Sequence, residues 1–410
     1  MKYILSLALL LTTIFTAVTC SSPARKLADE GDLLFTQHKY NEAIASYNEA
    51  LKADPKIILN GQLANAYMGK AEESYSKQNY TSLPDYYNEA VGLNPEIANG
   101  TGSDLGNRLY LAGTDYMLKQ EWVKAVDAFS AAVDIGYASE ELHLKRAGAY
   151  IALNLNYAAV SDCYKALALN PDSVSAYKLR GIAYYQAGEY DKALEDYSRA
   201  ISGDASDKQV YFNRAMVWIA KGYYDLAIRN LGAALDIDRT YIAAGIWLGR
   251  AYFKKSQYYA AIDQFTATLA GSSAEAMVVY NDRAVSLGKT GKFNEALQDL
   301  DTLIAFNPKF YPAYYNRGVI LMKMAQVEKA IGDLTVYLCL DSNDYYGYAC
   351  LAEAWRNCYG NYFLYSDRED IVGEAVKRCG AIILSGKGYP DLLHSGGHLY
   401  FQSERGGKWF

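Results

Sequence analysis

The sequence predicts an all-α protein in which about ten helix-turn-helix units stack into a solenoid. Two observations predict this fold. A motif of small and aromatic residues recurs about every 34 residues, and the apolar residues of each copy follow the spacing of a helix. The composition agrees, because the 410 residues include only 8 prolines but 39 tyrosines. The repeat itself accounts for most of these tyrosines.

One copy of the motif shows the pattern clearly. Tyr177, Gly181 and Tyr184 lie at positions i, i+4 and i+7, which places them on one face of a helix. A glycine-containing turn follows, and residues 190–200 carry a second helical stripe. Neither short helix can bury its apolar face alone, so successive copies must stack. About nine clear copies begin near Leu27, Asn65, Leu109, His143, Tyr177, Tyr211, Gly245, Tyr280 and Tyr314, and a tenth begins at Tyr348.

This pattern resembles the tetratricopeptide repeat, and the resemblance covers most of the chain from about residue 24 to residue 360. It implies a right-handed α-solenoid over residues 27–360, whose first helices line a concave groove for a protein or peptide partner. Small residues let the paired helices approach closely while tyrosines fill the remaining volume. Residues 361–410 are expected to end the array, with a capping helix over residues 367–384 and an irregular, glycine-rich tail.

The amino terminus is typical of an export signal. Lys2 precedes an apolar run over residues 3–18, which is shorter than the roughly 20 apolar residues of a membrane-spanning helix. The run leads to Cys20 in a tetrapeptide that resembles, in a looser form, the lipobox of bacterial lipoproteins. The resemblance implies a signal peptide over residues 1–20, a lipidated Cys20 and a tether over residues 21–26. The protein would then be lipid-anchored in the bacterial cell envelope, facing the periplasm or the exterior; plain cleavage and an uncleaved anchor are the alternatives.

A charged pair recurs in the same phase of four copies. An arginine stands just before the small residue of the first helix, and an aspartate follows sixteen residues later. Copies without the arginine also lack the aspartate, so we expect bidentate contacts that join the two helices. A role in ligand binding is the alternative. The predicted pairs are Arg146 with Asp162, Arg180 with Asp196, Arg283 with Asp299 and Arg317 with Asp333, while Arg214 is matched by Asn230.

The first helices carry a second apolar stripe that their own hairpins do not need. A helix that is apolar on two faces either buries both or presents one to a partner. We therefore predict that the stripe lines a groove for an extended peptide, a helix or an acyl-like ligand. Packing against the next repeat and self-association are the alternatives. The candidate groove residues are Tyr110, Met117, Leu144, Ile151, Ile182, Tyr185, Phe212, Met216, Ile219, Ile246, Phe253, Val285, Tyr315, Val319 and Met322.

Charged and polar residues near this stripe give weaker signals. Lys254, Lys289 and Lys323 lie toward its rim in three successive copies and would attract an acidic partner. Solvated charges at helix ends are the alternative. Some tetratricopeptide proteins grip the carboxylate of a peptide terminus with Lys, Asn and Arg on three adjacent first helices. Lys178 and Asn281 fall near such places but not in adjacent copies, so we do not expect this clamp.

Composition and motifs argue against several functions. The net charge of −6 provides no basic excess for the phosphate backbone, so nucleic acid is not an expected partner. The sequence contains no nucleophile elbow, zinc-protease motif or dinucleotide-binding fingerprint. We therefore expect no catalysis, no cofactor and no metal.

The cysteines leave their pairing open. In an exported protein, Cys339, Cys350, Cys358 and Cys379 could stay free thiols or form at least one disulfide. Cys350 and Cys358 are eight residues apart on one expected helix, about 12 Å along its axis, and should not pair with each other. Cys163 takes the place of a core tyrosine and is expected to be buried.

Together these features favour a non-catalytic scaffold for protein–protein interactions that is anchored to the bacterial envelope. By resemblance, such a scaffold would bind a partner peptide or helix in its apolar groove. The alternative is a periplasmic component that binds a hydrophobic ligand and could be associated with a transporter. The partner or ligand, the choice of inner or outer membrane, and the oligomeric state are left open by the sequence.

Overall fold

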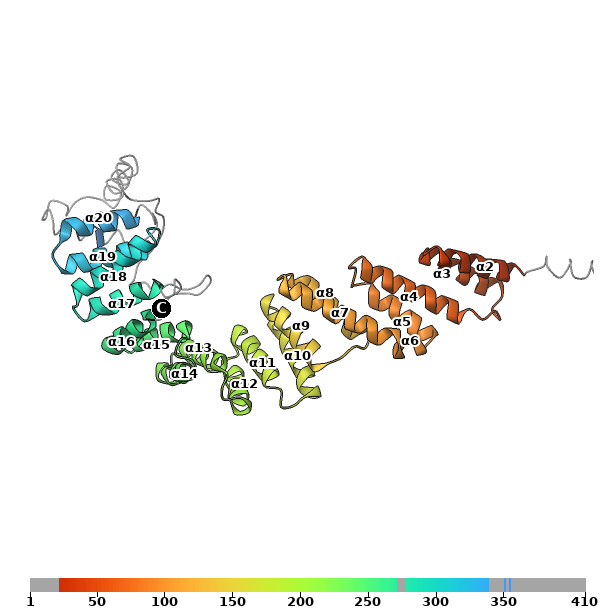
Figure 1. The fold of residues 1–410 in the computed structure, drawn as a ribbon, viewed down its shortest axis with the longest axis horizontal. Coiled ribbons are helices and arrows are strands. Elements are labelled where there is room, and N and C mark those ends of the chain that lie inside the picture. The colour runs from red at the N-terminus through yellow and green to blue at the C-terminus, as the bar shows by residue number, and fades with distance from the viewer. Residues whose placement is uncertain (1–21, 271–276, 339–349, 352–353, 355–410) are drawn as a thin grey trace, which may run out of the picture. The chain divides into compact units, whose positions relative to one another are not determined.

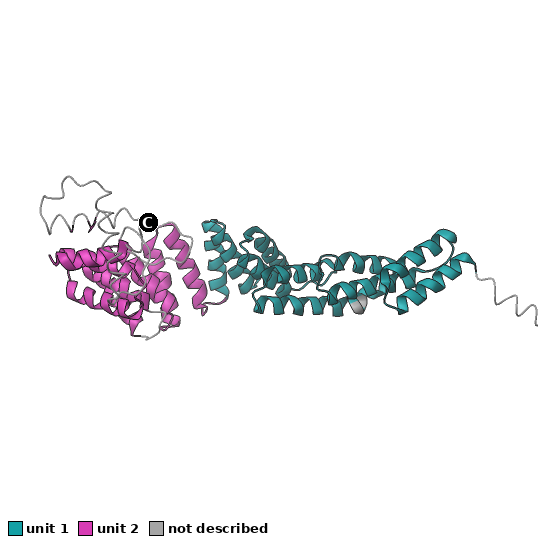
Figure 2. Cartoon of the chain, turned by 90° about the horizontal axis from the view of Figure 1, so that it is seen from above, with its two compact units in different colours: residues 1–203 teal, residues 204–410 magenta. Residues whose placement is uncertain are grey.

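The structure is a computed structural model that describes residues 22–270, 277–338, 350–351 and 354. Every regular element in these ranges is a helix, and no strand occurs among them. The predicted all-α fold is therefore confirmed. The chain divides into two compact units, residues 1–203 and 204–410, which Figure 2 shows in different colours.

Unit 1 is a stack of helical hairpins in chain order (Figure 1). A short helix, α6 (Glu96–Asn99), lies between the second and third hairpins. The second helix of one hairpin packs against the first helix of the next, as α8 does against α9 and α10 against α11. The hairpins are α2 (Pro23–Thr36) with α3 (Tyr40–Ala53), α4 (Asn60–Ser76) with α5 (Leu83–Leu93), α7 (Thr101–Leu118) with α8 (Trp122–Asp134), α9 (Glu140–Ala152) with α10 (Asn156–Leu169), and α11 (Val174–Gln186) with α12 (Tyr190–Gly203).

Unit 2 continues the same hairpin pattern. Its described hairpins are α13 (Lys208–Ala220) with α14 (Tyr224–Ile237), α15 (Ile242–Lys254) with α16 (Tyr258–Leu269), α17 (Val278–Lys289) with α18 (Phe293–Phe306), and α19 (Pro312–Lys323) with α20 (Val327–Leu338). Each unit is thus a helical repeat solenoid, and each of the nine predicted copies from Leu27 to Tyr314 falls on one hairpin. The tenth copy from Tyr348, the capping helix and the signal peptide lie outside the described residues, apart from three residues of that copy.

The turn inside each described hairpin places one residue in the left-handed region, and in three hairpins that residue is glycine. Gly188 has φ +79°, in the left-handed region, and its N–H donates to the carbonyl of Tyr185 at 3.0 Å. The next N–H, from Glu189, donates to the carbonyl of Tyr184 at 2.8 Å. These bonds satisfy carbonyls at the end of the first helix and reverse the chain. Glycine suits this position because it lacks a Cβ, yet six described hairpins place another residue there, among them Ala325 with φ 57°.

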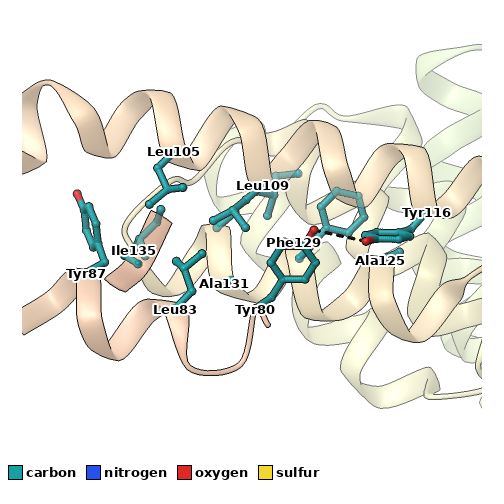
Figure 3. Close-up of a cluster of buried hydrophobic side chains, with 14 of the residues drawn as sticks. Tyr80, Leu83, Tyr87, Leu105, Leu109, Tyr116, Ala125, Phe129, Ala131 and Ile135 are labelled. Atoms are coloured by element: carbon teal, nitrogen blue, oxygen red, sulfur yellow. Dashed lines mark hydrogen bonds between the residues drawn. The ribbon is translucent and has the colours of Figure 1, made fainter. Parts of the chain in front are cut away.

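In four hairpins a glycine on the first helix faces an aromatic ring on the second. A Cβ added to Gly181 would lie 2.7 Å from Cε1 of Tyr197, and one added to Gly113 would lie 2.5 Å from Cε1 of Phe129. Phe129 is fully buried in a cluster formed with Leu83, Leu105 and other side chains of α5, α7 and α8 (Figure 3). The close approach of helix to ring is therefore what fixes the hairpin geometry.

Candidate functional site

The predicted arginine and aspartate side chains form bidentate contacts in the structure. The Arg180 Nε and Nη2 atoms donate to Oδ2 and Oδ1 of Asp196 at 2.8 and 2.7 Å. In the fourth hairpin, Arg146 makes the same pair of bonds to Asp162 at 2.7 and 2.8 Å. The matching bonds are 2.8 and 2.7 Å for Arg283 with Asp299, 2.7 and 2.7 Å for Arg317 with Asp333, and a single 2.7 Å bond for Arg214 with Asn230.

These guanidinium groups also contact the preceding hairpin, which sequence reasoning missed. Arg146 Nη1 donates to the hydroxyl of Ser130 on α8 at 3.0 Å, and Arg283 Nη1 donates to Thr266 on α16 at 3.0 Å. The guanidinium of Arg180 instead lies 4.4 Å from the ring centre of Tyr164 on α10. Each of these arginines therefore joins three helices. The signal that would have revealed these contacts is a polar or aromatic residue sixteen or seventeen positions before each arginine.

The candidate groove residues lie on one side of the first helices, here called the first-helix face. In unit 1, α9 contacts both α7 and α11, so this face runs across three successive first helices. Every candidate on it is half-buried, and Tyr110 and Met117 pack against a buried core cluster. These residues are Tyr110 and Met117 on α7, Leu144 and Ile151 on α9, and Ile182 and Tyr185 on α11.

Two leucines on α7 are more exposed than any of the predicted residues of unit 1. Leu111 is 54% exposed and Leu118 is 81% exposed. They are seven residues apart, so they lie on the same side of α7, each beside one of the half-buried residues Tyr110 and Met117. The sequence prediction was therefore one residue away from the most exposed part of this stripe.

The apolar surface continues from α7 to α9. A Cβ added to Gly148 on α9 would lie 3.6 Å from Cε of Met117, so the methionine packs where α9 has no side chain. Lys145 Nζ lies 5.9 Å from the ring centre of Tyr110. Burial raises the pKa of Tyr110 to about 12, with a smaller contribution from the carboxylate of Glu141. Apolar contact thus continues from α7 to α9, with Lys145 and Glu141 beside it.

Most candidates in unit 2 are also half-buried, and their rings are held by neighbours. The Phe212 ring lies 5.4 Å from that of Tyr241, and the Phe253 ring lies 5.2 Å from that of Tyr258. The half-buried candidates are Phe212, Met216, Ile219, Ile246, Phe253, Val319 and Met322.

Two candidates do not offer surface, which corrects the sequence prediction. Val285 is fully buried, and Tyr315 is buried with its ring 5.1 Å from that of Tyr337. Neither side chain can therefore line an open groove. The repeat pattern predicted which side of the helix these two residues occupy, but it did not predict that this side is buried.

A buried polar network lies beside these two residues. Arg250 Nε donates to Oδ2 of Asp282 at 2.7 Å, which joins α15 to α17. Asn316 Nδ2 donates to Oδ1 of Asn281 at 2.7 Å, which joins α19 to α17. Sequence reasoning missed this network. The sequence feature that could have revealed it is Arg250, because the equivalent position in the repeat that begins at Tyr177 is the apolar Ile182.

Other chemistry is sparse in the part of the chain that the structure describes. No group of three His, Cys, Asp or Glu side chains there could hold a metal ion. None of the described helices has the length and apolar character needed to cross a membrane. Cys163 is buried, and burial raises the pKa of its thiol to about 12. Cys350 Sγ lies 3.5 Å from the Tyr315 hydroxyl, whereas Cys20, Cys339, Cys358 and Cys379 lie outside the described residues.

Comparison with protein families decides what these hairpins are. Two family models, both described as tetratricopeptide repeat, match residues 28–96 and 174–202. The first match spans α2 to α5 and the second spans α11 and α12. The hairpins in these two segments are tetratricopeptide repeats. The pair of Arg180 and Asp196 lies within the second match.

The curated relatives of this chain are distant. Human RNA polymerase II-associated protein 3 is 25% identical over 182 residues, covering 41% of this chain and 27% of the relative. The Hsp70-Hsp90 organizing protein of Triticum aestivum is 24% identical over 223 residues, covering 45% and 38%. A DnaJ homolog subfamily C member 7 homolog of Dictyostelium discoideum is 20% identical over 344 residues, covering 76% and 61%. The chain thus spans less than two thirds of each of these relatives.

Solved structures include similar repeat proteins. A tetratricopeptide repeat protein from Parabacteroides merdae ATCC 43184 has a TM-score of 0.46 at 18% identity, covering 62% of this chain and 99% of that chain. The MamA protein has a TM-score of 0.38 at 23% identity, covering 41% and 92%.

Proposed function

We propose that this tetratricopeptide repeat protein is a non-catalytic scaffold that binds a partner protein through the first-helix face of unit 1. The observation that carries the proposal is the exposure of Leu111 and Leu118 on α7. They extend the half-buried apolar strip that continues over α9 and α11. An apolar surface that spans several elements normally marks an interaction site.

The chemistry of this face indicates the kind of partner. The two leucines are seven residues apart and lie beside Tyr110 and Met117. Such a surface fits the apolar side chains of an amphipathic helix or of an extended peptide that binds in a groove. The relative from Triticum aestivum is named for organizing Hsp70 and Hsp90. We extend from it only the general role of binding protein partners. A carboxylate clamp is not part of the proposal, because Asn281 is fully buried and bonded to Asn316.

The proposed place of action is the bacterial cell envelope. The apolar run before Cys20 supports export, and lipidation of Cys20 would tether the solenoid to a membrane, facing the periplasm or the exterior. The scaffold would then collect its partner at that membrane.

The test compares charge substitutions at leucines of equal exposure. Both variants are made in the full chain and studied in its own envelope. Leu111→Glu places a charge on the proposed face, whereas Leu169→Glu places one at the end of α10. The two leucines are almost equally exposed, at 54% for Leu111 and 55% for Leu169. Cross-linking followed by quantitative mass spectrometry should show a protein retained by the wild type and by Leu169→Glu but reduced at least about tenfold by Leu111→Glu, a loss of about 1.4 kcal/mol or more.

Two results would contradict this proposal. Identical retained proteins in all three forms would exclude the first-helix face of unit 1 as the partner site. Native mass spectrometry of the purified chain gives the second result. A small hydrophobic molecule of defined mass that is released on denaturation, and whose occupancy falls in Leu111→Glu, would indicate a ligand-binding protein instead.

A further inference from the structure

The loop between the first two hairpins carries an apolar side chain that the fold does not bury. Residues 54–59 join α3 to α4. Ile57 is half-buried and Leu59 is 2% exposed, and both belong to the apolar cluster of the first two hairpins. Ile58 stands between them and is 86% exposed, more than any other large apolar side chain in the described residues. Because its two neighbours hold the loop, Ile58 is presented to the surroundings in a fixed place.

Later loops between hairpins of unit 1 do not present such a side chain. The loop from α8 to α9 carries Ile135, which is 8% exposed, and Tyr137, which lies against Gly106 of α7. The loop from α10 to α11 covers residues 170–173, none of which is a large apolar residue. An exposed isoleucine is therefore not a requirement of the hairpin connection.

Basic side chains lie at the same end of the first hairpin as Ile58. Helices α2 and α3 form a hairpin, so the end of α3 and the loop after it lie beside the start of α2 (Figure 1). Lys26 on α2 and Lys56 in the loop are exposed, and neither has an ion-pair partner among the described residues. Asp54, the carboxylate of the loop, is half-buried and accepts the N–H of Lys56 at 3.0 Å.

The other two cations of this end are paired with carboxylates that lie farther from it. Arg25 pairs with Asp29 and Lys52 pairs with Glu49, each about one turn farther along its own helix. All four basic residues are exposed. An apolar side chain with cations around it matches a bilayer surface, where acyl chains lie below anionic headgroups.

The attachment point proposed above is close to this end in the sequence. Cys20 precedes Pro23, the first residue of α2, by three residues, which span at most about 10 Å. The neighbouring helix α3, from which the loop continues, lies about 10 Å from α2. A membrane that holds Cys20 is therefore within reach of Ile58. The alternative apolar anchor over residues 3–18 would place the membrane at the same end.

We propose that the loop over residues 54–59 contacts the surface of an anionic lipid bilayer, with Ile58 at the acyl chains and Lys26 and Lys56 beside the headgroups. This inference rests on the proposed attachment to the envelope. The tether supplies the attachment, because one apolar side chain alone binds a bilayer only weakly. The loop sets the orientation, so that this end of unit 1 faces the membrane. The first-helix face takes no part in the contact.

Photo-cross-linking in the native envelope tests the contact directly. A benzophenone amino acid replaces Ile58 in the full chain, and the same replacement at Leu155 is the control. Leu155 is 51% exposed and lies in the turn between α9 and α10, at the opposite end of the hairpins from the connecting loops. Mass spectrometry should find phospholipid adducts at position 58 at least about tenfold more often than at position 155. Equal yields, no lipid adduct at position 58, or adducts to a protein there would overturn the inference.

Charge reversal tests the part played by the lysines. Lys26→Glu combined with Lys56→Glu should lower the yield of lipid adducts at position 58 at least about threefold, because cations near an anionic surface are attracted to it. The matched control combines Lys39→Glu with Lys77→Glu, which reverses two exposed lysines in the turns of the first and second hairpins. Equal yields in the two double variants would contradict a contact with anionic headgroups.

Sedimentation of the same samples separates this inference from the proposed attachment. A wild-type chain that stays in the soluble fraction contradicts both. A chain that sediments with membranes but gives no lipid adduct at position 58 contradicts the loop contact alone.

Discussion

At the scale of single residues, the recurrent arginines are structural rather than available for ligands. The Arg180 side chain is 12% exposed, and its Nε and Nη2 atoms both donate to Asp196. Its guanidinium lies against Tyr164 of the preceding hairpin. Burial raises the pKa of Asp196, and the guanidinium of Arg180 opposes that rise. The pair therefore depends on both charges being present.

Removal of one partner should destabilise the protein strongly. Asp196→Ala leaves the Arg180 guanidinium buried without its carboxylate, and we expect a loss of about 2 to 4 kcal/mol in the free energy of unfolding. Urea denaturation measures it. The control Glu195→Ala removes only an exposed contact with Arg199 and should cost less than about 1 kcal/mol. Equal small losses for both variants would show that the buried pair contributes little.

The buried carboxyl of Asp282 predicts a dependence of stability on pH. Burial raises the pKa of Asp282 to about 6, although Arg250 acts to lower it. The folded protein therefore binds a proton between about pH 4 and pH 6 that the unfolded chain does not bind. Stability from this group should rise as pH falls from 7 to 5, by about 1 kcal/mol.

The variant Asp282→Asn isolates this contribution. Its unfolding free energy should lack the gain between pH 7 and pH 5 that the wild type shows, while the other buried carboxyl groups affect both proteins equally. Denaturation curves at several pH values give the comparison. Parallel dependence in the two proteins would mean that Asp282 has an ordinary pKa.

At the scale of the hairpin, the close packing of a glycine on the first helix against an aromatic ring on the second contributes to the stability of the fold. Gly113 faces the fully buried Phe129, and an added Cβ would lie 2.5 Å from Cε1 of that ring. Gly232 on α14 has nothing within 4 Å of an added Cβ. The two glycines are both helical, so the same substitution separates packing from helix propensity.

Alanine at these two positions should have opposite effects. Gly113→Ala should destabilise by about 1 to 3 kcal/mol because the ring must move. Gly232→Ala should stabilise by roughly 0.5 to 1 kcal/mol because alanine loses less backbone entropy. Thermal and urea unfolding of the two variants provide the measurement. A stabilised Gly113→Ala variant would show that the helices can separate at little cost.

At the scale of the whole molecule, the repeat period predicted the hairpins well because every copy repeats the same local packing. The exposed surface was harder to predict. Adjacent residues on a helix point about 100° apart, so the choice of Tyr110 over Leu111 misplaced the exposed edge. The burial of Val285 and the contact between Arg250 and Asp282 escaped prediction for another reason. Both depend on neighbouring copies, and a pattern within one copy does not encode them.

The tether of the molecule is the remaining large-scale prediction. If Cys20 carries lipid, two or three acyl chains at about 0.8 kcal/mol per buried CH₂ would hold the solenoid on the membrane, whereas one chain would bind reversibly. The described helices offer no spanning segment of their own. Membrane association of the described units would then depend on a single side chain.

Metabolic labelling in a bacterial host tests this dependence. The wild type should incorporate a clickable fatty acid and sediment with membranes, and Cys20→Ala should lose the label and appear in the soluble fraction. Cys163→Ala is the control, because that thiol is buried and its loss should leave both properties unchanged. Label retained in Cys20→Ala would place the lipid elsewhere. Unlabelled wild type that still sediments would indicate an uncleaved apolar anchor over residues 3–18 instead.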